Sequence, residues 1–163
     1  MKLFFAIFIL AFMSLPSEAQ KPELDKAARS ILARQFSSWG PADIRKEIVE
    51  YYNVSRIWEQ PNRIAGDWNG DGRRDLAVLL QHKREASRRI LLVLLRSGRG
   101  YSPYILESDD CLMSIKKGEA GYDFETGRKF RYRNDAIFSY IFEKAGTSYI
   151  WEKIRFRRIV TSD

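Results

Sequence analysis

The distribution of apolar residues divides the chain into three parts. Residues 3–13 form an unbroken apolar run (LFFAIFILAFM). Two segments with apolar residues at helical spacing follow, residues 24–32 and 44–52, and Pro22 stands at a favourable first position for the earlier helix. From Arg63 onward, short apolar or alternating runs are separated by turn residues, which is typical of β-strands.

Seven of these later runs are expected to form strands. Turns at residues 97–100 and 144–146 predict two hairpins among them. Successive hairpins with short loops favour an antiparallel meander with helices on one side. The sequence therefore predicts an α+β fold, in which two N-terminal helices pack on an antiparallel β-meander sheet in a single domain. The expected strands are residues 76–81, 89–95, 101–106, 111–115, 136–142, 147–151 and 156–160.

The first apolar run predicts export. Lys2 precedes the run, Pro16 ends it, and Ser17 and Ala19 supply small residues for cleavage after Ala19. A membrane-spanning helix needs roughly 20 apolar residues, so a retained anchor is the less favoured alternative. We therefore expect residues 1–19 to be a signal peptide. Residues 20–163 would form a periplasmic or secreted domain with no transmembrane segment.

The composition of the chain is that of a globular protein, with 45% hydrophobic residues and a formal net charge of +7. Cys111 is the only cysteine, so an internal disulfide is excluded. It lies in an apolar run and is most simply a small buried residue. A bound metal ion could supply part of the stabilisation that a disulfide gives to many exported domains.

The stretch GDWNGDGRRD, residues 66–75, is the most informative part of the sequence. Side chains with oxygen atoms stand at alternate positions, with one more after a gap. Calcium takes about six to eight oxygen ligands, and carboxylates this close repel one another unless a cation lies between them. We predict a site for one calcium ion, although a metal-free Gly/Asp/Asn-rich turn is the alternative. The predicted ligands are the side chains of Asp67, Asn69, Asp71 and Asp75 and the main-chain carbonyl of Arg73.

The spacing does not fit an EF-hand, because Val78 occupies the position of the bidentate glutamate and an apolar strand-like run follows Asp75. The sequence GDWNGDGRRDLAVLL instead resembles the calcium loop of FG-GAP and VCBS-type repeats. The resemblance implies that the loop joins two strands and that the same five residues bind calcium. It does not extend to the propeller fold, since the chain is too short. The remainder is similar to small exported bacterial proteins that carry such a loop and a C-terminal FEK…Y-x-W stretch.

Basic residues are concentrated in three segments, residues 83–89, 128–133 and 153–158. In the second segment cations alternate with aromatic residues, so a strand would place them on opposite faces. A solvated sheet face is the simplest interpretation. The candidate partners are an anionic polymer of the cell envelope or another envelope protein, and export argues against nucleic acid.

Evidence for catalysis is sparse. His82 is the only histidine, and no G-x-S-x-G motif is present. Two clusters of carboxylates could supply an acid–base pair for hydrolysis of a glycosidic bond. The sequence therefore predicts a non-enzymatic, calcium-binding exported domain, with a small envelope hydrolase that uses a carboxylate pair as the alternative. The clusters are Glu107, Asp109 and Asp110, and Glu119, Asp123 and Glu125.

Overall fold

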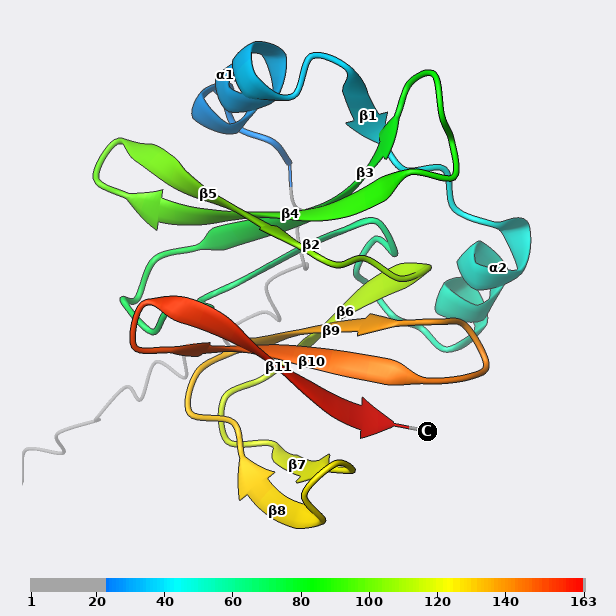
Figure 1. Ribbon diagram of the computed structural model, residues 1–163, viewed down its shortest axis with the longest axis vertical. Helices are drawn as coiled ribbons and strands as arrows, with labels where there is room; N and C mark the ends of the chain where they lie inside the picture. The colour runs from blue at the N-terminus through cyan, green and yellow to red at the C-terminus, as the bar shows by residue number, and fades with distance from the viewer. Residues whose placement is uncertain (1–22, 163) are drawn as a thin grey trace, which may run out of the picture.

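The computed structural model describes residues 23–162 (Figure 1). These residues form eleven strands and two short helices, and the strands fall into three antiparallel sheets. The predicted α+β fold, with both helices packed on one meander, is therefore wrong, and the protein is mostly β. The predicted signal peptide, residues 1–19, lies outside the described residues.

The first sheet is built around two strands that are apolar along most of their length. Its strand order is β1-β3-β4-β5, and β2 also pairs with β3. The predicted turn after β4 is present, because Ser97 pairs with Gly100 at the start of β5. The strands are β1 (Trp39–Pro41), β2 (Arg63–Gly66), β3 (Asp75–His82), β4 (Arg89–Ser97) and β5 (Gly100–Leu106).

The second sheet has the order β11-β10-β9-β6. Because β6 pairs directly with β9, the chain between them forms a separate two-stranded hairpin, β7–β8, below the sheet in Figure 1. The strands of the second sheet are β6 (Cys111–Ile115), β9 (Ala136–Tyr140), β10 (Gly146–Glu152) and β11 (Arg155–Ser162). The hairpin consists of β7 (Ala120–Asp123) and β8 (Arg128–Arg131).

The two larger sheets pack face to face and enclose the main core (Figure 1). Alternate residues of β3 and β4, such as Leu79 and Leu91, belong to the same buried cluster as Leu112 and Ile137 of the second sheet. Each fully buried leucine side chain contributes about 1.5–3 kcal/mol relative to exposure. The first sheet therefore depends on the second sheet to cover one of its faces.

Helix α1 (Lys26–Gln35) covers the other face of the first sheet. Its Ala28 and Ile31 pack with Val78 and the remaining alternate residues of β3 and β4. The helix begins later than Pro22 because the Asp25 side chain accepts a hydrogen bond from the Ala28 N–H at 2.8 Å and caps it. The continuous apolar runs of β3 and β4 are thus explained by burial on both faces.

Helix α2 (Lys46–Val54) packs beside the second sheet and not beside α1. Ile48 and Tyr52 contact Cys111, and the Tyr52 hydroxyl donates to the Leu112 carbonyl at 2.6 Å. Cys111 is buried as expected, and burial raises the pKa of its thiol to about 11. Apolar periodicity predicted seven of the eleven strands among residues 23–162 but missed β1, β2, β7 and β8. It also did not show how the strands divide into sheets, and this is why the predicted fold was wrong. Within residues 23–162, neither helix is long and apolar enough to cross a bilayer.

Candidate functional site

The predicted calcium ligands lie in the hairpin loop between β2 and β3. Gly66 pairs with Asp75 in the last rung of this hairpin, so residues 67–74 form the loop itself. Trp68 turns back into the molecule, is 0% exposed and joins the core between the two sheets. The loop is therefore anchored at its base by a large buried side chain.

Asp75 is fully buried and binds main-chain groups of two neighbouring segments. Its Oδ2 accepts a hydrogen bond from the Trp68 N–H at 3.0 Å, and its Oδ1 accepts one from the Arg96 N–H at 2.7 Å. Burial raises the pKa of Asp75 to about 6, the two N–H groups lower it, and the nearby Asp71 raises it. Asp75 thus joins the loop to β4.

Asp67 stands at the opposite end of the loop. Its Oδ2 accepts a hydrogen bond from the Gly72 N–H at 2.9 Å, which closes the loop on itself. Its Oδ1 is buried and has no hydrogen-bond partner among the described residues. An unpartnered carboxylate oxygen shielded from water is costly, so this atom is a position where a cation would lower the free energy.

The middle of the loop consists of local turn interactions. Asn69 Oδ1 accepts from the Asp71 N–H at 3.1 Å, and Asp71 Oδ1 accepts from the Arg73 N–H at 2.9 Å. Asp71 and Arg73 are exposed, and Asn69 is half-buried. These bonds shape the turn, and none of them connects the three residues to the rest of the fold.

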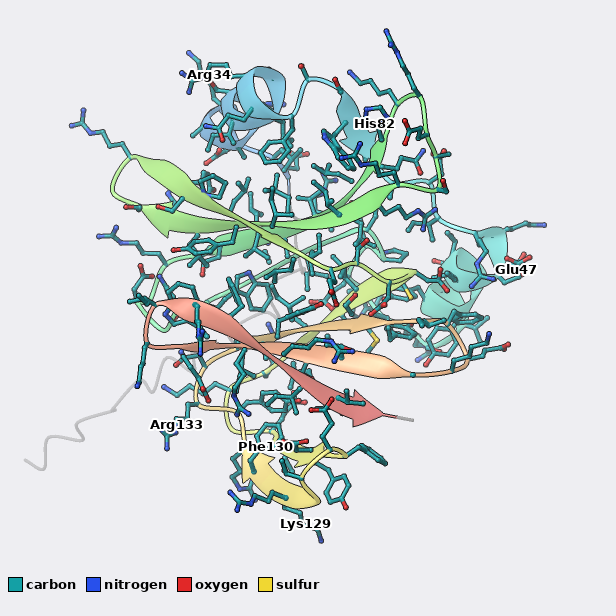
Figure 2. The ribbon with its side chains drawn as sticks, in the orientation of Figure 1. Arg34, Glu47, His82, Lys129, Phe130 and Arg133 are labelled. Carbon is teal, nitrogen blue, oxygen red and sulfur yellow. The ribbon has the colours of Figure 1, made fainter. Side chains whose placement is uncertain are left out.

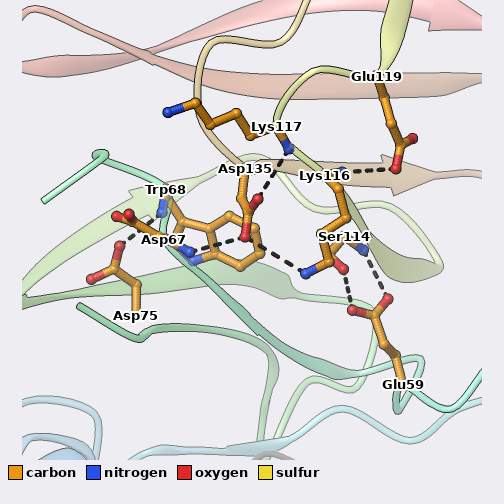
Figure 3. Close-up of polar contacts among 9 residues, drawn as sticks. All are labelled: Glu59, Asp67, Trp68, Asp75, Ser114, Lys116, Lys117, Glu119 and Asp135. Carbon is orange, nitrogen blue, oxygen red and sulfur yellow. Dashed lines mark hydrogen bonds and ion pairs between the residues drawn. The ribbon is translucent and has the colours of Figure 1, made fainter. Parts of the chain in front are cut away.

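Two residues that the sequence did not single out hold the loop against the second sheet. Asp135 Oδ2 accepts from the Asp67 N–H at 3.2 Å, and its Oδ1 accepts from the Lys117 N–H at 3.1 Å (Figure 3). Asn134 donates to the Trp68 carbonyl at 3.4 Å. Asn134 and Asp135 follow the basic segment 128–133, and nothing local marks them as partners of a loop more than sixty residues earlier.

The donor set of the loop fits a hard cation in part. Every side chain proposed as a ligand offers oxygen, and Asp67 presents an unpartnered buried oxygen. Among residues 23–162, however, no three His, Cys, Asp or Glu side chains are gathered so that they could hold a metal ion. An amide and a main-chain carbonyl would therefore have to complete the coordination shell, and calcium accepts both.

The carboxylate clusters of the alternative hydrolase have mainly structural contacts. Asp110 pairs with Arg45 at 2.8 Å, and Asp123 Oδ1 accepts from the Glu125 N–H at 3.0 Å in a turn. Burial raises the pKa of Asp109, although its bond with Ser139 opposes this. Two further acidic residues meet a single arginine. These are Glu107 and Glu125, which lie 3.9 Å and 3.8 Å from Arg158.

The remaining candidates for chemistry are placed as follows. Glu119 accepts a hydrogen bond from the Lys116 N–H at 3.1 Å in the turn before β7. His82 ends β3, and its ring makes an edge contact with Trp39 at 5.4 Å between ring centres. Within residues 23–162, no serine or cysteine side chain is hydrogen-bonded to His82. The absence of this contact does not test for activity, and the expectation of a non-enzymatic protein stays a prediction.

The chain matches no protein-family model, no curated protein and no solved structure. The resemblance of the loop to FG-GAP and VCBS-type repeats therefore stays a prediction.

Proposed function

We propose that this protein is an exported, non-enzymatic domain that binds one calcium ion in the loop between β2 and β3, where the ion stabilises the hairpin. The observation that carries the proposal is the Asp67 Oδ1 atom, which is buried and has no hydrogen-bond partner among the described residues. Asp67 is the first residue of a loop rich in oxygen-bearing side chains. A divalent cation bound there would compensate for the buried charge and reduce the repulsion among Asp67, Asp71 and Asp75.

The chemistry of the loop favours calcium over transition metals. The proposed ligands contain neither imidazole nor thiolate, and Cys111 lies elsewhere, in the core beside α2. Oxygen ligands suit calcium and magnesium, whereas zinc and copper prefer nitrogen and sulfur. A loop that mixes carboxylate, amide and carbonyl oxygens suits calcium better than magnesium, which requires near-octahedral geometry.

A structural role for the ion is favoured by what surrounds the loop. Asp75 fixes the base of the loop to β4. Asn134 and Asp135, which stand just before β9, bind the first two residues of the loop, Trp68 and Asp67. An ion bound to the loop would therefore stabilise the junction of the two sheets. Because only the native state holds these segments together, calcium should shift the folding equilibrium toward it.

Urea unfolding of the purified protein in EDTA and in excess calcium tests this proposal. An ion bound only to the native state, at about 100 times its dissociation constant, adds roughly 2.7 kcal/mol to the free energy of unfolding. Magnesium at the same concentration serves as the control for ionic strength. Equal unfolding curves in EDTA and calcium would contradict the proposal, as would an equal calcium shift in an Asp71→Ala variant.

A further inference from the structure

Two basic segments that are distant in the sequence line the same groove. The groove has a volume of about 480 Å³ and lies between the end of β8 and the turn that joins β10 to β11. One side carries Arg131 and Arg133, and the other carries Lys153 and Arg157. We propose that this groove binds an anionic polysaccharide, a function that does not depend on calcium in the loop.

The acidic residues of the groove are largely neutralised by the protein itself. Asp135 accepts two main-chain N–H bonds and lies 3.6 Å from the Lys116 ammonium. Glu152 pairs with Arg157 at 3.1 Å. The groove therefore retains an excess of positive charge that only a ligand or solvent can balance.

Three cations supply this excess. The Arg131 guanidinium donates to the Gly118 carbonyl at 2.8 Å, which fixes its position without cancelling its charge. Arg133 and Lys153 are exposed, and neither forms an ion pair or side-chain hydrogen bond within residues 23–162. Figure 2 shows Arg133 extending away from the ribbon beside β8. Charged groups on both sides of an open groove suit a chain that carries repeated negative charges.

The backbone conformation of Lys153 provides a way to separate binding from folding. Lys153 has a φ of 58°, in the left-handed region that favours glycine, at the tip of the β10–β11 hairpin. Replacement by glycine would therefore remove the charge and relieve the backbone strain at the same time. The strained residue is also one of the two unpaired cations of the groove.

Aromatic side chains favour a sugar as the anionic ligand. Phe130 and Trp151 line the groove and are half-buried. Their rings make edge contacts with Tyr132 at 4.9 Å and Phe156 at 5.0 Å, which restricts the area open to a ligand. A sugar ring can pack its C–H groups against such an apolar surface, and comparison with an oligothymidylate tests for a nucleic acid instead.

A larger cleft, of about 920 Å³ beside β5, is less suited to an anion. Its lining sets two carboxylates, Glu23 and Asp25, against three arginines, Arg73, Arg74 and Arg96, whereas the groove sets two carboxylates against four cations. Arg96 is paired with Asp25 at 2.5 Å. The positive charge of this cleft is therefore more fully compensated than that of the groove. The groove between β8 and the β10–β11 turn is the better candidate.

Binding of a fluorescent heparin oligosaccharide tests the proposal, with neutral dextran and an oligothymidylate of equal charge as comparison ligands. We expect heparin to bind, and its affinity to fall between about 50 mM and about 200 mM salt. The double substitution Lys153→Gly and Arg133→Gln should weaken binding roughly twentyfold, because each exposed charge contact is worth about fivefold. The Lys153→Gly change should leave the melting temperature equal or higher, which separates lost binding from lost folding.

Arg56→Gly is the matched control. Arg56 is also a cation at positive φ (54°), but it follows α2, at the other end of the second sheet from the groove (Figure 1). This variant should bind heparin within about twofold of the wild type. Equal losses in Arg56→Gly and in the Lys153→Gly single variant would overturn the proposal, because each variant removes one positive charge and equal losses would indicate a response to net charge alone. Tighter binding of oligothymidylate than heparin, or no preference for heparin over dextran, would also overturn it.

Discussion

The two parts of the loop between β2 and β3 use the same residue types in different ways. At its base, Asp75 is fully buried and binds main-chain groups of Trp68 and Arg96. In its middle, the side chains of Asn69 and Asp71 make only local turn bonds among the described residues. The base is therefore required by the fold itself, whereas the middle contributes little unless an ion binds. Substitutions in the two parts should separate folding from metal binding.

The largest effect is expected at Trp68. Its side chain is 0% exposed and lies in the core shared by both sheets. Trp68→Ala should lower the free energy of unfolding by roughly 3–5 kcal/mol, because it leaves a large cavity. Urea unfolding measures this, with Trp68→Phe as a milder control. A loss below about 1 kcal/mol for the alanine variant would show that the base of the loop does not anchor the hairpin.

Asp75 should follow. Asp75→Ala leaves the buried N–H groups of Trp68 and Arg96 without acceptors, which costs about 1–3 kcal/mol each. We expect a loss of roughly 2–4 kcal/mol in EDTA, where no calcium is bound. Asp75→Asn retains one acceptor oxygen and should lose less. If the alanine variant were as stable as the wild type in EDTA, the structural role of Asp75 would be wrong.

Two glycines in the middle of the loop give a matched pair. Gly70 and Gly72 have φ of 75° and 77°, so alanine strains both, but only at Gly70 would a Cβ lie 2.5 Å from Asn134 Oδ1. Gly70→Ala should therefore destabilise by about 1–3 kcal/mol and Gly72→Ala by about 1 kcal/mol. Asn134→Ala should remove most of the difference between them. Equal costs for the two glycine variants would indicate that the loop does not press against Asn134.

The smallest effect on the metal-free protein is expected at Asp71. This residue is exposed, and its side chain accepts only local bonds, so Asp71→Ala should change stability in EDTA by no more than about 0.5–1 kcal/mol. The same variant should lose the stabilisation by calcium. Unfolding curves recorded with and without calcium measure both quantities. A large loss in EDTA would place Asp71 among the residues of the base.

The sequence revealed the elements of this fold more readily than their arrangement. The apolar runs of β3 and β4 and the turn at Gly100 are local signals, and they predicted strands and a hairpin. The pairing of β6 with β9 spans an inserted hairpin, and no local pattern encodes such a contact. The same limit applies to the site. The alternating oxygens of residues 67–75 are visible in the sequence, whereas the contacts from Asn134, Asp135 and Arg96 depend on tertiary structure.

Equilibrium dialysis against calcium tests the central claim most directly, because it counts bound ions without reference to stability. The account predicts one ion for each chain in the wild-type protein and none in the Asp71→Ala variant. The Gly100→Ala variant, altered in a turn where an added Cβ meets nothing within 4 Å, should bind as the wild type does. No bound calcium in the folded wild-type protein, or the same amount in the Asp71→Ala variant, would contradict the account.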